Sequence, residues 1–138
     1  MQLLRNKSEN RIHVLSVEDS RTEALLYSRK ITAADDGRIT IHNVGTLGEA
    51  LDYLRTNRVD VVLLDLGLPD SDGVHSIHEL NSKFPHLPIV ILSAREDELS
   101  IMSYLEYGAQ EFLLKGECSG AMVRQSIYNA MFRKSLHK

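Results

Sequence analysis

Apolar and polar residues alternate in blocks along the chain, and these blocks predict strands and helices in turn. Short runs rich in aliphatic residues predict five strands, at 12–17, 39–44, 59–64, 89–92 and 111–114. Between them, apolar residues recur at helical spacing and predict helices at about 20–34, 46–56, 73–83, 97–107 and 119–134. Two uninterrupted runs, at 61–64 and 89–92, are typical of central strands buried on both faces, whereas the alternating run at 39–44 is typical of an edge strand.

Capping residues and apolar stripes define the predicted helices further. Three helix starts are marked by candidate N-caps, namely Asp19 or Ser20, Thr46 and Asp72. In the first helix, the residues expected to be buried are Ala24, Leu25, either Tyr27 or Ser28, and Ile31. In the last helix they are Val123, Ile127, Ala130 and Met131. The turn at Asp35-Asp36-Gly37 closes the first helix, and we expect its two acids to be solvated.

Regular alternation of strands and helices predicts an α/β fold. The expected architecture is a three-layer, doubly wound, five-stranded parallel sheet with helices on both faces. A chain of 138 residues fits one domain and is too short for a closed eight-stranded barrel. Five strands favour the flavodoxin-like order 2-1-3-4-5. We therefore expect a single domain over 1–138, with 1–10 as an N-terminal extension, 11–134 as the core and no effector domain.

Composition narrows the functional classes. Apolar residues make up 43% and charged residues 25% of the chain, which is ordinary for a soluble globular protein. The net charge of −3 and a pI near 6.0 give no electrostatic case for nucleic acid as a partner. The apolar runs are too short to span a membrane, and the N-terminus lacks the core of a signal peptide. A single cysteine, Cys118, rules out an internal disulfide and favours a cytoplasmic location, with the thiol as a bystander in a polar loop.

Residues with useful chemistry follow four of the predicted strands. They are Glu18 and Asp19 after the first, Asp65 after the third, Ser93 after the fourth and Lys115 after the fifth. In the order 2-1-3-4-5 the first and third strands are neighbours, about 4.8 Å apart. The carboxyl ends of parallel strands share one edge of the sheet, which is where ligands bind in open α/β folds. Three carboxylates are therefore expected to converge, with a hydroxyl and an ammonium beside them.

Such a cluster needs compensating charge. Each pair of carboxylates within about 5 Å costs on the order of 3 kcal/mol at an effective dielectric constant near 20. A hard divalent cation with oxygen ligands offsets this cost, and Mg²⁺ typically binds through a few carboxylates plus a phosphate, with Mn²⁺ as an alternative. Lys115 alone cannot balance three negative charges, but its position and that of Ser93 suit an anionic ligand. The arrangement predicts a phosphoryl group attached to Asp65 or held beside it.

Four motifs carry a resemblance to a known family. They are VEDS at 17–20, LLDLGLPDSDG at 63–73, ILSA at 91–94 and FLLK at 112–115. Together, in this order, they resemble the response-regulator receiver domain of two-component signalling over nearly the whole chain. The resemblance implies that Asp65 is the phosphoacceptor and that Mg²⁺ is held by Glu18, Asp19, Asp65 and the backbone carbonyl of Gly67. It also implies that the phosphoryl group is contacted by Lys115, Ser93 and the backbone amides of Leu66 and Ala94.

The resemblance further implies a switch and a set of partners. Ser93 would move toward the phosphoryl group and Phe112 would turn inward, which would reshape the surface formed by 97–107, 111–114 and 119–134. The donor would be a sensor histidine kinase or a histidine phosphotransfer protein, and a downstream protein or a tethered output domain would read the change. The chain would catalyse only its own phosphorylation and dephosphorylation. Tyr128 and Phe132 add apolar surface to the last helix. This surface suits a contact with a second copy of the chain or with a partner, and aromatic side chains that simply lie near a chain end are the alternative explanation.

Two departures and three alternatives accompany this interpretation. Gly116 follows Lys115 where the family commonly has proline after a cis peptide, and Phe112 replaces a tyrosine often found at the switch position. A receiver-like scaffold that is never phosphorylated is the first alternative. A calcium loop around Asp70 and Asp72 fits poorly, because Leu68 occupies the first ligand position. A phosphatase similar to the haloacid-dehalogenase class is disfavoured, because Gly67 stands where that class has a second aspartate.

Overall fold

The computed structural model describes residues 10–94 and 104–136. In chain order its elements are β1 (Ile12–Val17), α1 (Arg21–Ala34), β2 (Ile39–Val44), α2 (Leu47–Thr56), β3 (Val61–Leu64), α3 (Gly73–Lys83), β4 (Ile89–Ser93), β5 (Glu111–Leu114) and α5 (Gly120–Ser135). Most of the helix expected at 97–107 lies outside the described residues, and 104–106 are helical. Among the helices that the structure describes, none is long and apolar enough to cross a membrane.

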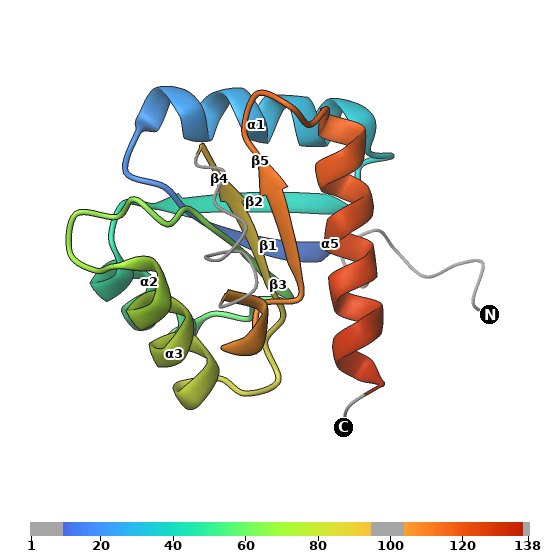
Figure 1. The fold of residues 1–138 in the computed structure, drawn as a ribbon. Coiled ribbons are helices and arrows are strands. Elements are labelled where there is room, and N and C mark those ends of the chain that lie inside the picture. The colour runs from blue at the N-terminus through green and yellow to red at the C-terminus, as the bar shows by residue number, and fades with distance from the viewer. Residues whose placement is uncertain (1–9, 95–103, 137–138) are drawn as a thin grey trace.

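The five strands form one parallel sheet in the order β2-β1-β3-β4-β5, which confirms the prediction. Figure 1 shows α1 and α5 on one face of this sheet and α2 and α3 on the other. β3 begins two residues later than expected, at Val61. The reason lies at Asp60, whose carboxylate, rather than a backbone carbonyl, accepts the N–H of His13 at 2.8 Å.

Two apolar cores lie between the sheet and its helices. Alternate residues of each central strand face opposite cores: Val62 and Leu64 pack under α2 and α3, while Val61 and Leu63 pack under α1 and α5. All four of these side chains are buried, so β3 has no wet face. This two-sided burial explains why the strand sequence is apolar without interruption.

The buried face of α1 differs from the expected stripe. Tyr27 and Ile31 are buried and belong to the core shared with α5, but Leu25 is 52% exposed. Residues four apart share a helix face, whereas a residue two positions away lies about 200° around the helix. Because Tyr27 faces inward, Leu25 must face solvent. The expectation that Leu25 joins the stripe is wrong.

Asp35 is not the solvated turn acid that the sequence suggested. Its side chain is 0% exposed. It accepts hydrogen bonds from the N–H groups of Arg38 at 2.7 Å and Ile39 at 2.8 Å, from Nε of Arg124 at 3.0 Å and from the Tyr128 hydroxyl at 3.3 Å. Burial alone would raise the pKa of Asp35, but these hydrogen bonds outweigh it and hold the pKa below its ordinary value. One carboxylate therefore joins the α1–β2 turn to α5.

The segment that leads into α5 packs tightly against α1. A Cβ at Gly120 would lie 2.1 Å from the carbonyl oxygen of Lys30, so only glycine permits this approach. Two residues earlier, Cys118 is buried in the core between α1, α5 and the sheet, and burial raises the pKa of its thiol. Cys118 does lie in a loop, as expected, but its side chain belongs to the apolar core rather than to polar surroundings.

Candidate functional site

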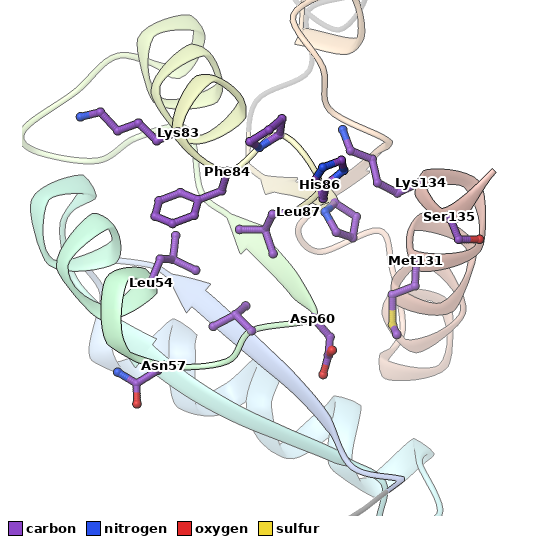
Figure 2. Close-up of a pocket in the computed structure, with 13 residues that line it drawn as sticks. Leu54, Asn57, Asp60, Lys83, Phe84, His86, Leu87, Met131, Lys134 and Ser135 are labelled. Carbon is purple, nitrogen blue, oxygen red and sulfur yellow. The ribbon is translucent and has the colours of Figure 1, made fainter. Parts of the chain in front are cut away.

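Among the residues that the structure describes, two sizeable cavities lie at opposite ends of the strands. The larger, about 610 Å³, lies where β3 and β4 begin, and its lining includes Leu54, Asp60, Leu87 and Met131 (Figure 2). The ammonium group of Lys83 at its rim points away from Leu87 (Figure 2). The other cavity, about 520 Å³, lies at the carboxyl ends of the strands, which is the edge where open α/β sheets bind ligands. The second cavity is therefore the candidate site on chemical grounds, although it is the smaller.

Every site residue expected from the sequence lines this second cavity: Glu18, Asp19, Asp65, Leu66, Gly67, Ser93, Ala94, Phe112 and Lys115. Backbone hydrogen bonds that continue the sheet beyond the strand ends hold several of them in place. The N–H of Asp65 donates to the carbonyl of Val17 at 3.0 Å, and the N–H of Lys115 donates to the carbonyl of Ser93 at 2.8 Å. The register of the sheet, rather than loop packing, thus brings these distant segments together.

The acidic cluster is compact. Glu18, Asp19 and Asp65 each place a carboxylate oxygen within 4.8 Å of the others. Glu18 is only 6% exposed, and burial raises its pKa, with the neighbouring Asp65 charge acting in the same direction against the influence of Lys115. Three convergent oxygen donors whose negative charge is not fully offset fit a hard divalent cation such as Mg²⁺ or Mn²⁺. Gly67 adjoins the cluster, because a Cβ placed on it would lie 3.7 Å from Oδ2 of Asp65.

Lys115 supplies the positive charge of the site. Its Nζ makes a close ion pair with Oε1 of Glu18 and lies 3.6 Å from Oδ1 of Asp65. The side chain is only 9% exposed. Burial would lower the pKa of Lys115, but the hydrogen bond to Glu18 and the Asp65 charge, followed by Glu23, raise it above its ordinary value. The ammonium is therefore held in its charged form beside the candidate phosphoacceptor.

Asp70 and Asp72, the two acids of the loop after Asp65, are engaged in helix capping. The two carboxylate oxygens of Asp70 accept hydrogen bonds from backbone N–H groups in the first turn of α2, one from Leu47 at 2.9 Å and one from Gly48 at 3.0 Å. These hydrogen bonds lower the pKa of Asp70. Asp72 caps α3 by accepting the N–H of His75 at 2.8 Å. The calcium-loop alternative therefore loses support, and the loop that carries Gly67 is tied to α2.

The two residues expected to act as the switch lie at the ends of neighbouring strands. Ser93 is 2% exposed at the end of β4, and Phe112 is partly buried in β5. The Phe112 ring is parallel to that of Tyr104, with an interplanar angle of 2° and 6.2 Å between centroids. Tyr104 also reaches α3, since a Cβ at Gly73 would lie 3.1 Å from its ring. Sequence reasoning missed Tyr104, because nothing in its local pattern indicated a contact with the cavity.

Gly116 replaces the proline that is common in the resembled family. No cis peptide bond occurs in the described residues, so the Lys115–Gly116 bond is trans. Gly116 has φ +83°, a left-handed conformation that favours glycine. Its N–H, which a proline would lack, donates to the hydroxyl of Tyr27 at 2.9 Å. This departure thus anchors the end of β5 to α1.

Glu23 is a further site residue that sequence reasoning missed. It lies in the first turn of α1 and lines the cavity, with Oε1 at 3.1 Å from Nζ of Lys115. The only sequence signal was its position three residues after Ser20, which is the spacing of a helix capping box. That spacing predicts a local role, so the contact with Lys115 emerges only from the fold.

Comparison with known proteins agrees with the resemblance seen in the sequence motifs. The family model of the response regulator receiver domain matches residues 14–125. The chain is 34% identical over 119 residues to the regulatory protein LuxO of Vibrio cholerae, an alignment that covers 86% of this chain and 25% of LuxO. It is 35% identical over 102 residues to the transcriptional regulatory protein BasR of Escherichia coli, covering 74% of this chain and 45% of BasR. The chain thus spans about a quarter to a half of these relatives.

Solved structures show the same fold. The signal receiver domain of a putative LuxO repressor protein from Vibrio parahaemolyticus aligns with a TM-score of 0.81 at 26% identity, covering 92% of this chain and 95% of that one. A CheY-like response regulator receiver domain protein from Methanospirillum hungatei aligns with a TM-score of 0.79 at 16% identity, covering 93% of this chain and 99% of that one.

Proposed function

The chain belongs to the response-regulator receiver family of two-component signalling, and from this premise we propose that Asp65 accepts a phosphoryl group from a phosphohistidine of a partner protein. The observation that carries the proposal is the convergence of Asp65 with Glu18, Asp19 and Lys115 at one edge of the sheet. A structural ion pair would need only one of these carboxylates. Three carboxylates beside the Lys115 ammonium instead suit a site that binds a cation and a phosphoryl group together.

In the proposed reaction, a carboxylate oxygen of Asp65 attacks the phosphorus atom of the phosphohistidine. A P–O bond forms as the P–N bond breaks, and the imidazole leaves with the electron pair and takes up a proton. Phosphoryl transfer of this kind depends mainly on positioning and on stabilisation of the charge on the phosphoryl oxygens. The ammonium of Lys115 lies 3.6 Å from Oδ1 of Asp65 and provides part of that stabilisation.

The remaining roles are those that the family resemblance implies for residues that line the cavity. Glu18, Asp19, Asp65 and the carbonyl of Gly67 would hold Mg²⁺, with Mn²⁺ as an alternative. When bound, the ion neutralises charge on the carboxylates and on the phosphoryl oxygens. Leu66, Ala94 and Ser93 line the same cavity. The backbone amides of Leu66 and Ala94 and the hydroxyl of Ser93 would donate hydrogen bonds to those oxygens.

The proposed output is a change in surface shape. Ser93 would move toward the phosphoryl group, and Phe112 would turn inward, away from its stacked position against Tyr104. The change would reach β5, α5 and the segment before β5, where a downstream protein, a tethered output domain or a second copy of the chain would read it. The donor would be a cytoplasmic sensor histidine kinase domain or a histidine phosphotransfer protein.

Incubation with acetyl phosphate or the cognate phosphorylated kinase, with Mg²⁺ present, tests the proposal. Intact-mass measurement should show one added phosphoryl group per chain, and Asp65→Asn should show none. A scaffold that is never phosphorylated would gain no mass under either condition. Repeated turnover of a phosphomonoester would instead identify a phosphatase, so the three functions give different results.

A further inference from the structure

Glu23 occupies the position of a capping glutamate but does not cap. The Ser20 hydroxyl accepts the N–H of Glu23 at 3.3 Å, which is one half of a capping box. In the other half, the glutamate side chain would accept the backbone N–H of the N-cap residue. That N–H instead donates to Oε2 of Glu18 at 3.0 Å. The Glu23 carboxylate is thereby released from the helix terminus and lies 3.1 Å from Nζ of Lys115.

At the start of α2, a glutamate three residues after the N-cap does cap its own helix. Thr46 caps α2, and Glu49 follows three residues later. Oε1 of Glu49 turns back and accepts the Thr46 hydroxyl and the N–H of Gly45, both at 3.2 Å. The two helices thus carry the same motif, but only Glu23 is directed across 92 residues of sequence to the phosphorylation site.

Among the carboxylates that contact Lys115, Glu23 differs from Glu18 and Asp65 in what happens when the site is loaded. Under the proposed function, on which this inference rests, Glu18 would bind the cation, and Asp65 would lose its carboxylate charge when it becomes an acyl phosphate. Glu23, which is 48% exposed, keeps its charge and its access to Lys115. It therefore remains as a competitor of the phosphoryl oxygens for the ammonium.

We propose that Glu23 is a positioning residue that shares Lys115 with the phosphoryl group and so sets the balance between cation affinity and phosphoryl affinity. Its negative charge favours a nearby Mg²⁺ ion. The same charge opposes an anionic phosphoryl group and draws Lys115 away from it. These two effects have opposite signs, whereas local damage to α1 would weaken both kinds of binding.

Glu23→Gln tests the proposal, because glutamine keeps the side-chain size and a hydrogen-bond acceptor for Lys115 while removing the charge. Calorimetric titration with Mg²⁺ alone should show binding weakened about two- to fivefold. Fluorine NMR titration with beryllofluoride at saturating Mg²⁺ should show binding tightened about three- to tenfold. Glu49→Gln is the matched control. It changes the net charge equally at the same capping position, and it should leave the affinity for beryllofluoride within about twofold of the parent, since Glu49 does not contact Lys115.

Each outcome has a definite meaning. Equal beryllofluoride affinity in Glu23→Gln and the parent protein, or weaker binding of both ligands, overturns the role of Glu23. A parent protein that binds no beryllofluoride overturns the proposed function itself, so the two failures are distinguishable. Thermal unfolding in the presence of a chelator should place the two variants within a few degrees of one another, because neither charge is required for the fold.

Discussion

Replacing Lys115 with methionine removes the ammonium that offsets the acidic cluster while keeping an unbranched side chain of similar length. The groups left behind are nearly enclosed, since the side chains of Glu18 and Asp65 are 7% and 13% exposed. The variant should therefore unfold more easily in metal-free buffer. The same loss should matter less when a cation occupies the cluster.

The size of the effect follows from the contacts of Lys115. At 3.6 Å and an effective dielectric constant near 20, its attraction to Asp65 alone is about 4–5 kcal/mol before desolvation is counted. Breaking a fully buried pair typically costs about 3–5 kcal/mol. Here, the pKa of Glu18 is already raised by burial, so its carboxyl group can take up a proton, and water reaches Asp65 from the cavity. A net loss of about 1–3 kcal/mol in the free energy of unfolding is the expected result.

Urea denaturation followed by circular dichroism measures this loss, once with a chelator and once with excess MgCl₂. The difference between Lys115→Met and the parent protein should shrink in Mg²⁺, because the bound ion supplies the missing positive charge and binding stabilises the folded state. Lys83→Met provides the matched control. Its salt bridge to Glu79, at 3.1 Å, is partly exposed to solvent, so Lys83→Met should leave the free energy of unfolding nearly unchanged in both buffers.

Equal stability of Lys115→Met and the parent protein in the chelator would refute the reasoning. A difference that is unchanged by Mg²⁺ would do so as well, since the ion would then not be replacing the charge of Lys115.

Two further predictions concern the contacts between α1 and α5. Asp35→Ala should lower the free energy of unfolding at neutral pH by about 2–4 kcal/mol, because four donors lose their acceptor. The lowered pKa of Asp35 means that this contribution is complete above the unfolded-state value of about 4 and is lost as the pH falls toward the folded-state value. Urea denaturation should therefore give free energies of unfolding for Asp35→Ala and the parent protein that converge as the pH is lowered. A difference between the two proteins that does not change with pH would contradict this account. Gly120→Ala should cost about 2–4 kcal/mol through its clash with Lys30, whereas Gly48→Ala, whose Cβ meets nothing closer than 3.7 Å, should change stability by less than about 1 kcal/mol in the same assay.

The order of the strands and the edge that carries the site could be predicted from the sequence because both depend on local patterns. Uninterrupted apolar runs such as Val61–Leu64 identify the central strands, and the polar residue that ends each run is carried to the same edge by the parallel geometry. Asp65 and Lys115 could therefore be placed in one cavity before their contacts were known. Their chemical roles rest on the family resemblance and remain predictions.

Contacts made by long side chains could not be predicted in this way. Asp35 looked like a solvated turn acid because its partners Arg124 and Tyr128 lie about 90 residues away, on a helix whose orientation is set by the whole core. Glu23 was missed because its spacing from Ser20 fits a local helix cap, and that spacing cannot show that the N–H of Ser20 is already bonded to Glu18. Leu25 was assigned to the buried stripe because it is apolar, but it lies about 200° around α1 from Tyr27, which is the residue that packs toward α5.

Identification of the phosphorylated residue tests the central claim most directly. The protein would be incubated with its kinase or with acetyl phosphate and Mg²⁺, and intact-mass measurement would be followed by mapping of the modified peptide. The account predicts one phosphoryl group per chain, located on Asp65, and none on Asp65→Asn. An unmodified parent protein under both donors, or undiminished labelling of Asp65→Asn, would contradict it.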